Sequence, residues 1–123
     1  MKKTLIALLF ASTLAGCSLV APTSDGSYFT EVRTGDTVEL KISGGESRID
    51  KLTMSIDGDK LAYLSSNGLL CEDVGSAIHC VAETISAHAE ASVKIKANVG
   101  SVRASAFYNP DGGALRFVVA KPL

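Results

Sequence analysis

Residues 91–99 read ASVKIKANV, and apolar and polar side chains alternate along them without a break. A repeat of two residues puts one set of side chains on a buried face and the other on a wet face, which is typical of an antiparallel β-strand. Four further stretches repeat the pattern, at 38–43, 52–57, 101–106 and 115–119. In each of them we expect the apolar residues to face the core. The alternation therefore predicts an all-β domain.

Clusters of Gly, Asp, Asn and Pro separate these stretches. They stand at 35–36, 44–45, 57–59, 67–68, 75–76, 100 and 109–113. Such clusters favour turns, because glycine accepts a positive φ and Asn and Asp side chains hydrogen-bond to nearby backbone. Seven to nine short strands joined in this way predict a two-sheet antiparallel sandwich.

Length and charge bound the function. The chain has 123 residues, which is enough for one ordinary domain. Its 12 basic and 13 acidic side chains give a net charge of −1, so we expect no nucleic-acid partner bound through a basic surface. Apolar residues make up 46% and charged residues 20%, and this balance excludes an intrinsically disordered chain.

The first residues look like an export signal. A basic start, Lys2 and Lys3, precedes a mostly apolar stretch over residues 4–13. About ten residues are too few for a helix that crosses a hydrocarbon core of about 30 Å, which needs roughly 20. The length suits the apolar region of a secretion signal. The alternative is a buried N-terminal helix of the folded domain.

The next four residues are Leu14, Ala15, Gly16 and Cys17. They match the lipobox at every position, and residues 1–17 as a whole resemble the signal of bacterial lipoproteins. The resemblance implies cleavage between Gly16 and Cys17, a diacylglycerol thioether on the Cys17 sulfur and an acyl chain such as palmitate on the new amino terminus. Two or more chains hold a protein stably to a bilayer.

This resemblance also predicts a location and a layout. The chain would be lipid-anchored in a bacterial cell envelope, with the membrane as its first partner. Ser18 after the lipidated Cys implies the outer membrane, facing the periplasm or the cell surface, if the cell is Gram-negative. We expect a signal peptide over 1–16, the lipidated Cys and a flexible tether over 17–27, and the sandwich domain over 28–123.

Two cysteines are left for the domain. An even pair in an exported chain predicts a disulfide between Cys71 and Cys80. Gly75 and Ser76 favour a turn midway between them, and folding there brings the two Cα atoms about 4.5 Å apart, within bonding range. Two buried free thiols are an alternative. A metal site is a weaker one, because too few ligands with the usual spacing accompany the pair.

A second resemblance runs along residues 35–120. Residues 35–38, GDTV, open a strand, the two Cys bracket a hairpin, and the alternating stretch at 91–99 follows. This pattern resembles the immunoglobulin-like repeat domain found in tandem on bacterial surface proteins. Residues 44–48 replace the family's usual Asn-Pro-rich segment, and His88 stands where the family has Gly. The resemblance implies an immunoglobulin-like fold and a surface setting, and it implies no catalytic residue.

Candidate chemistry is sparse. His79 and His88 lack a partner motif such as G-x-S-x-G or H-E-x-x-H, and we expect both on the surface. Residues 57–59, DGD, offer two carboxylates but not the loop pattern of a calcium site. They are better explained as a hairpin turn. We therefore predict no catalytic residue, no metal and no cofactor.

Four residues form a candidate contact patch: Glu72 and Asp73 at the hairpin tip, and the neighbours Phe107 and Tyr108, of which one would point outward from a shared strand. The chain is then a non-enzymatic, membrane-anchored interaction or structural module with an unidentified envelope protein as partner. The alternative is an inhibitor of a hydrolase, in which the Cys71–Cys80 hairpin tip enters the active-site cleft.

Overall fold

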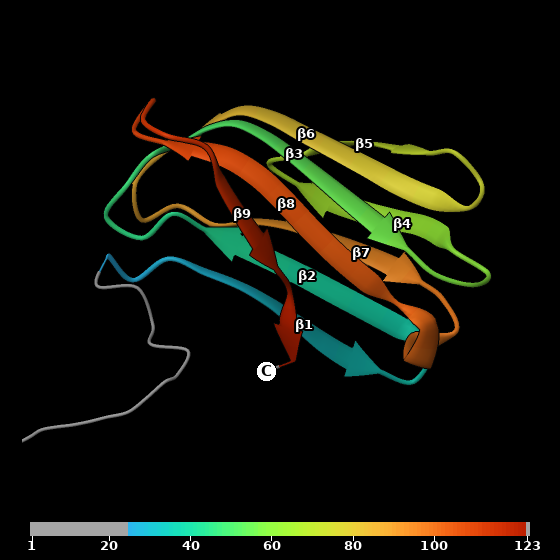
Figure 1. The fold of residues 1–123 in the computed structure, drawn as a ribbon. Coiled ribbons are helices and arrows are strands. Elements are labelled where there is room, and N and C mark those ends of the chain that lie inside the picture. The colour runs from blue at the N-terminus through green and yellow to red at the C-terminus, as the bar shows by residue number, and fades with distance from the viewer. Residues whose placement is uncertain (1–24, 123) are drawn as a thin grey trace, which may run out of the picture.

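The computed structural model describes residues 25–122, which form two five-stranded β-sheets packed face to face (Figure 1). A 3₁₀ turn over Val99–Ser101 is the one helical element in this part of the chain. The predicted all-β sandwich is confirmed. The strands are β1 (Tyr28–Thr34), β2 (Thr37–Ser43), β3 (Ile49–Asp57), β4 (Ala62–Asn67), β5 (Leu70–Asp73), β6 (Ala77–Ile85), β7 (Ala91–Lys96), β8 (Arg103–Pro110), β9 (Arg116–Val119) and β10 (Lys121–Pro122).

The connectivity is that of an immunoglobulin domain with one insertion. The sheets have the orders β10-β1-β2-β7-β4 and β5-β6-β3-β8-β9. Without β10 and the β5–β6 hairpin, seven strands lettered A to G along the chain give the sheets A-B-E-D and C-F-G, as in immunoglobulin domains. The hairpin enters between the fourth and fifth of these strands and extends the second sheet beyond β3. The predicted immunoglobulin-like fold is confirmed on this order.

The C-terminal strand departs from the prediction. Residues 25–122 contain ten strands where seven to nine were expected, and β10 pairs with β1 in parallel, with Thr30 opposite Lys121. The chain leaves the second sheet after β9, passes through buried Ala120 and joins the first sheet (Figure 1). The two sheets are thereby joined along one side by continuous backbone.

The core lies between the sheets and is made of the alternating apolar residues. The predicted inward residues in or next to β2, β3, β7 and β8 are buried, because the pleat sends every second side chain to the same face; the exception is Val99, which lies in the 3₁₀ turn and is partly buried. The buried residues are Val38, Leu40, Ile42, Leu52, Met54, Ile56, Ala91, Val93, Ile95, Ala97, Val102, Ala104 and Ala106.

In β9 the predicted face is wrong. Leu115, Phe117 and Val119 were expected to face inward, and all three are more than half exposed. The cause is the pairing with β8, in which Phe107 lies opposite Phe117. Directly opposed residues share a face, and β8 turns Tyr108 inward, so Phe107 and everything aligned with it face solvent.

The folded unit begins before the predicted boundary at residue 28. The Glu46 amide donates to the Asp25 carbonyl at 2.7 Å, and Arg116 forms an ion pair with the Asp25 carboxylate at 3.4 Å. Gly45 permits this contact, because a Cβ there would stand 1.8 Å from the Asp25 carbonyl oxygen. Residues 25–27 therefore belong to the sandwich. The predicted signal, Gly16, Cys17 and the rest of the tether lie outside the described residues.

Candidate functional site

Five side chains form a straight line across the outer face of the second sheet. The strand register places Leu70 opposite Val81, Val81 opposite Thr53, Thr53 opposite Phe107 and Phe107 opposite Phe117. We call this line the apolar row. Every strand of the sheet contributes one residue to it, and four of the five residues are hydrophobic.

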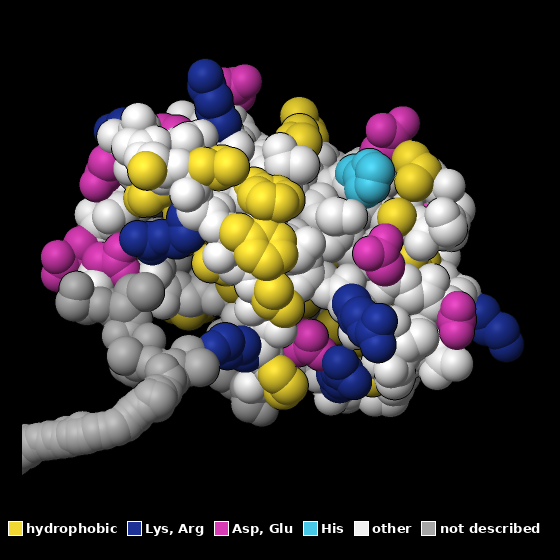
Figure 2. Space-filling view, viewed as in Figure 1, with side chains coloured by type: hydrophobic (Ala, Val, Ile, Leu, Met, Phe, Trp, Pro, Cys, Tyr) yellow, Lys and Arg dark blue, Asp and Glu magenta, His cyan; other side chains and the backbone are white. Residues whose placement is uncertain are grey.

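The apolar row is open to solvent. Leu70 is 79% exposed, Phe117 55%, Val81 45% and Phe107 44%. The rings of Phe107 and Phe117 lie 4.8 Å apart at their centroids, tilted by 46°. The electrostatic attraction between the edge of one ring and the face of the other stabilises such a pair, in addition to the burial of apolar area. The aromatic end of the apolar row is thus an ordered surface, and Figure 2 shows hydrophobic side chains forming a band across this face.

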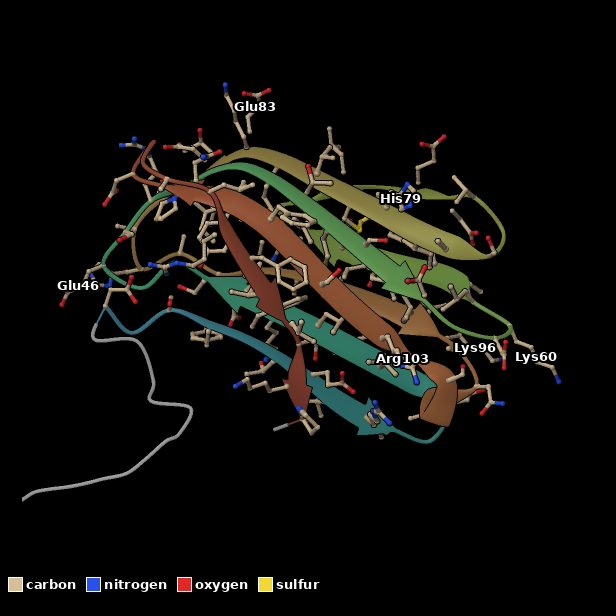
Figure 3. All side chains as sticks on the ribbon, viewed as in Figure 1. Glu46, Lys60, His79, Glu83, Lys96 and Arg103 are labelled. Carbon is tan, nitrogen blue, oxygen red and sulfur yellow. A yellow bond between two sulfur atoms is a disulfide. The ribbon has the colours of Figure 1, made fainter. Side chains whose placement is uncertain are left out.

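Polar side chains border the apolar row on both sides. The next line along the strands runs through Glu72, His79, Ser55 and Ser105 to Val119. Arg103 lies one step further, opposite Asp57. On the other side stand Lys51, Glu83 and Asn109, all on the same sheet. His79, Glu83 and Arg103 mark these borders in Figure 3. An apolar centre with a polar rim is the usual anatomy of a protein interface.

A groove of about 810 Å³ opens at the aliphatic end of the apolar row. Its lining includes Leu70, Val81 and Thr53 together with Leu69 and Glu83. The groove exists because β5 is four residues long and its pairing with β6 ends at the Leu70–Val81 pair. The β6 backbone beyond that point has no strand beside it on this side in the described structure.

A bulge in β3 places the rim residue Lys51 at the edge of this groove. The register against β8 shifts between Asp50 and Thr53, and Lys51 takes a positive φ of 55°. Arg48 donates one hydrogen bond from Nε, shared between both oxygens of the Asp50 carboxylate, and a second from Nη2. These bonds hold the pKa of Asp50 below its ordinary value, because they stabilise the ionised carboxylate.

The cysteine hairpin is confirmed. Cys71 and Cys80 are directly opposed in β5 and β6 and form a disulfide, with Cys80 fully buried on the inner face. Beyond the bond the tip is a compact turn. The Gly75 amide donates to the Asp73 carboxylate at 2.9 Å, and the Val74 amide donates to the Ala77 carbonyl.

The candidate contact patch is divided by the structure. Phe107 lies in the apolar row, and Glu72 lies on its rim, on the same face of the sheet. Tyr108 is 1% exposed and faces the core, so including it in a surface patch was wrong. Its hydroxyl lies 3.4 Å from Arg116, and this hydrogen bond is the first cause of a raised Arg116 pKa. Asp73 ends β5, and its carboxylate accepts a hydrogen bond from the Gly75 amide in the turn.

Other polar residues have structural roles. His79 and His88 are both exposed, as expected, and His88 has a positive φ of 65°, a conformation that favours Gly. Glu31 is the one buried charged side chain of the described residues, and Arg33 pairs with it. No group of three or more potential metal ligands occurs within residues 25–122. No helix in that part of the chain could cross a membrane.

Comparison with known proteins supports the fold. No protein-family model matches the chain, and no curated protein matches it either. Two solved structures of a GH20 exo-β-N-acetylglucosaminidase from Vibrio harveyi, one an inactive mutant and one with N-acetylglucosamine, match with a TM-score of 0.51 and 11% identity. Each match covers 79% of this chain and 18% of the glucosaminidase. At that identity the likeness concerns the fold alone.

The major pilin SpaD from Corynebacterium diphtheriae is also similar, with a TM-score of 0.47 and 10% identity. That match covers 93% of this chain and 36% of the pilin. The chain thus spans well under two thirds of the length of each of these proteins.

Proposed function

We propose that this chain is a lipid-anchored, non-enzymatic protein of the bacterial cell envelope whose sandwich acts as an interaction module. The apolar row is the observation that carries the proposal. Four hydrophobic side chains lie in one line on an ordered sheet, within reach of one partner surface. Contiguous apolar surface of this kind marks binding sites, whereas isolated exposed apolar residues are ordinary.

Export and anchoring are supported by the lipobox and by the disulfide. A disulfide persists in oxidising compartments and is rare in the cytosol. From Cys17 to Asp25 the chain spans eight residues, which reach at most about 29 Å when extended. Asp25 is fixed at one end of the sandwich by Glu46 and Arg116. A lipid on Cys17 would therefore keep the domain close to the membrane surface.

The anchor is tested by replacing Cys17 with Ser. We expect the variant to keep its signal peptide and to lose its acyl chains, because the thiolate is the group that takes the lipid. Partition of cells into a detergent phase and an aqueous phase, followed by mass spectrometry, measures both changes. Ser18→Ala is the matched control and should partition like the wild type. A Cys17→Ser protein that is still processed and still enters the detergent phase would refute the anchor.

One observation favours a second candidate, an inhibitor of a hydrolase. Val74 is 48% exposed at the tip of the hairpin, and the tip is braced by the Asp73 turn and, two residues further down, by the disulfide. A rigid loop with an outward side chain is what an active-site cleft would accept. The tip and the apolar row lie on the same sheet, but different residues carry them.

The two candidates are separated by capture from solubilised envelope. We expect Phe117→Ser to lose the captured partner, because it removes the ring at the aromatic end of the apolar row without changing the core. Val74→Ser, which truncates a similarly exposed side chain at the tip, should retain that partner. The reverse result, with a secreted hydrolase as the captured protein, would establish the inhibitor and reject the interaction module.

A further inference from the structure

We propose that the occupant of the apolar row is a second copy of this chain, in a face-to-face dimer whose two-fold axis passes beside Thr53. The inference rests on the proposed function, in which this face is an interaction surface. It adds the identity of the partner. Thr53 is the middle residue of the apolar row and lies on β3, the central strand of the sheet. A two-fold axis that lies in the plane of the interface, over the centre of this face, pairs the face with the same face of a second copy.

An axis parallel to β3 matches unlike halves of the apolar row. Rotation about it exchanges the β5–β6 side of the sheet with the β8–β9 side. Leu70 then meets Phe117 of the second copy, and Val81 meets Phe107 of the second copy. The most exposed aliphatic side chain is thereby covered by the most exposed ring of the apolar row. Both ends of the apolar row are buried by one arrangement.

The face is large enough for a stable pair. Five strands about 4.8 Å apart, with about seven residues each at ~3.4 Å, make a face of roughly 24 by 24 Å. That is ~600 Å² of flat area, and the pleat and side chains raise the accessible area above it. A standard interface buries about 800 Å² on each partner. Nearly the whole face would be covered, and no described segment packs on it.

One pair of opposite charges on the rim agrees with the same axis, whereas Asp57, on β3 itself, comes to lie near Asp57 of the second copy. Arg103 begins β8 and is exposed, on one side of β3. Glu72 and Asp73 end β5 on the other side of β3, and Glu72 lies on the line of Ser105, two residues closer to the apolar row than Arg103. Rotation about an axis parallel to β3 places Arg103 of each copy over the start of β6 in the other, next to the acidic end of β5. Such complementarity fixes orientation more than affinity.

The test is cross-linking in membranes from cells that express the full chain. Thr53→Cys places a thiol next to the axis, so a short bis-maleimide should join two copies. Lys94→Cys is the control, because Lys94 is also exposed and lies on β7, on the outer face of the other sheet. We expect at least about ten times more covalent dimer from Thr53→Cys than from Lys94→Cys. Equal yields would overturn the dimer.

Two further variants in the Thr53→Cys background show whether the apolar row and its rim are responsible. Phe117→Ser should abolish the cross-link while the Cys71–Cys80 bond, resistant to alkylation, reports an intact fold. Arg103→Glu should reduce the yield several-fold, and adding Glu72→Arg should restore it. A yield of covalent dimer that Phe117→Ser does not change would overturn the role of the apolar row. A yield that Arg103→Glu does not change would overturn the axis parallel to β3.

The products also separate this inference from the proposed function. A heavier adduct that contains a different envelope protein would reject the dimer and leave the interaction module in place. A chain that forms no adduct through Thr53→Cys, and whose captured partner is unaffected by Phe117→Ser, would reject both.

Discussion

Replacing Ile95 with Asp should lower the free energy of unfolding by about 4–5 kcal/mol, the largest effect we expect from one side chain. Ile95 is fully buried in β7, between Val38 of β2 and Tyr63 of β4. A carboxylate there has no hydrogen-bond donor beyond the strand backbone, and burying an unpaired charge is costly. Urea unfolding of the exported chain, followed by far-UV circular dichroism, measures the change.

The neighbouring residue supplies the control. Lys94 is exposed on the outer face of the same strand, opposite Glu39. Lys94→Asp introduces the same carboxylate at the same strand, and its cost should stay below about 1 kcal/mol, mainly from the like charge of Glu39. Similar midpoints for the two variants would mean that the two faces of β7 have been exchanged.

The contrast between β7 and β9 shows how far alternation predicts a structure. In β7 the apolar and polar sets differ so clearly that a single register buries one and exposes the other. In β9 both sets contain large apolar side chains, so pattern alone could not choose a face. The choice came from β8, where the Tyr108 side chain is buried between the sheets.

A signal for the β9 face was nevertheless present in the turn. Residues 111–115 form the connection between β8 and β9, and Phe107 and Phe117 are equally distant from Gly112 in the sequence. Folding the hairpin symmetrically about that glycine aligns the two rings, as the structure has them. Such symmetry fixes which residues share a face, but not whether that face is inside. The apolar row was therefore only partly predictable, through Phe107.

The β5–β6 hairpin was predicted as a hairpin but not placed. Its turn and its cysteines are local features, whereas its position beside β3 depends on pairings that span up to 36 residues, from Ile49 to Ile85. The bulge at Lys51 and the parallel β1–β10 pair have the same non-local origin. The turn residues and the two-residue repeat are local signals, and they predict where the strands lie. Pairing between distant strands decides which surfaces those strands expose.

Removing the disulfide should have the second-largest effect. Replacing both Cys71 and Cys80 with Ala frees a loop whose ends are nine residues apart, and the chain-entropy relation gives about 2.7 kcal/mol for that loop. The secondary structure should survive, because β6 keeps its pairing with β3 along its whole length. The β5 strand, which pairs in its sheet with β6 alone, should lose its order first. Hydrogen exchange of the Leu70–Asp73 amides tests this directly.

Reduction of the wild type should reproduce the loss of stability, and reduction of the double variant should change nothing. If these amides stay protected and the midpoint does not move, the bond has no stabilising role, and the rigidity of the tip comes from the Asp73 turn alone.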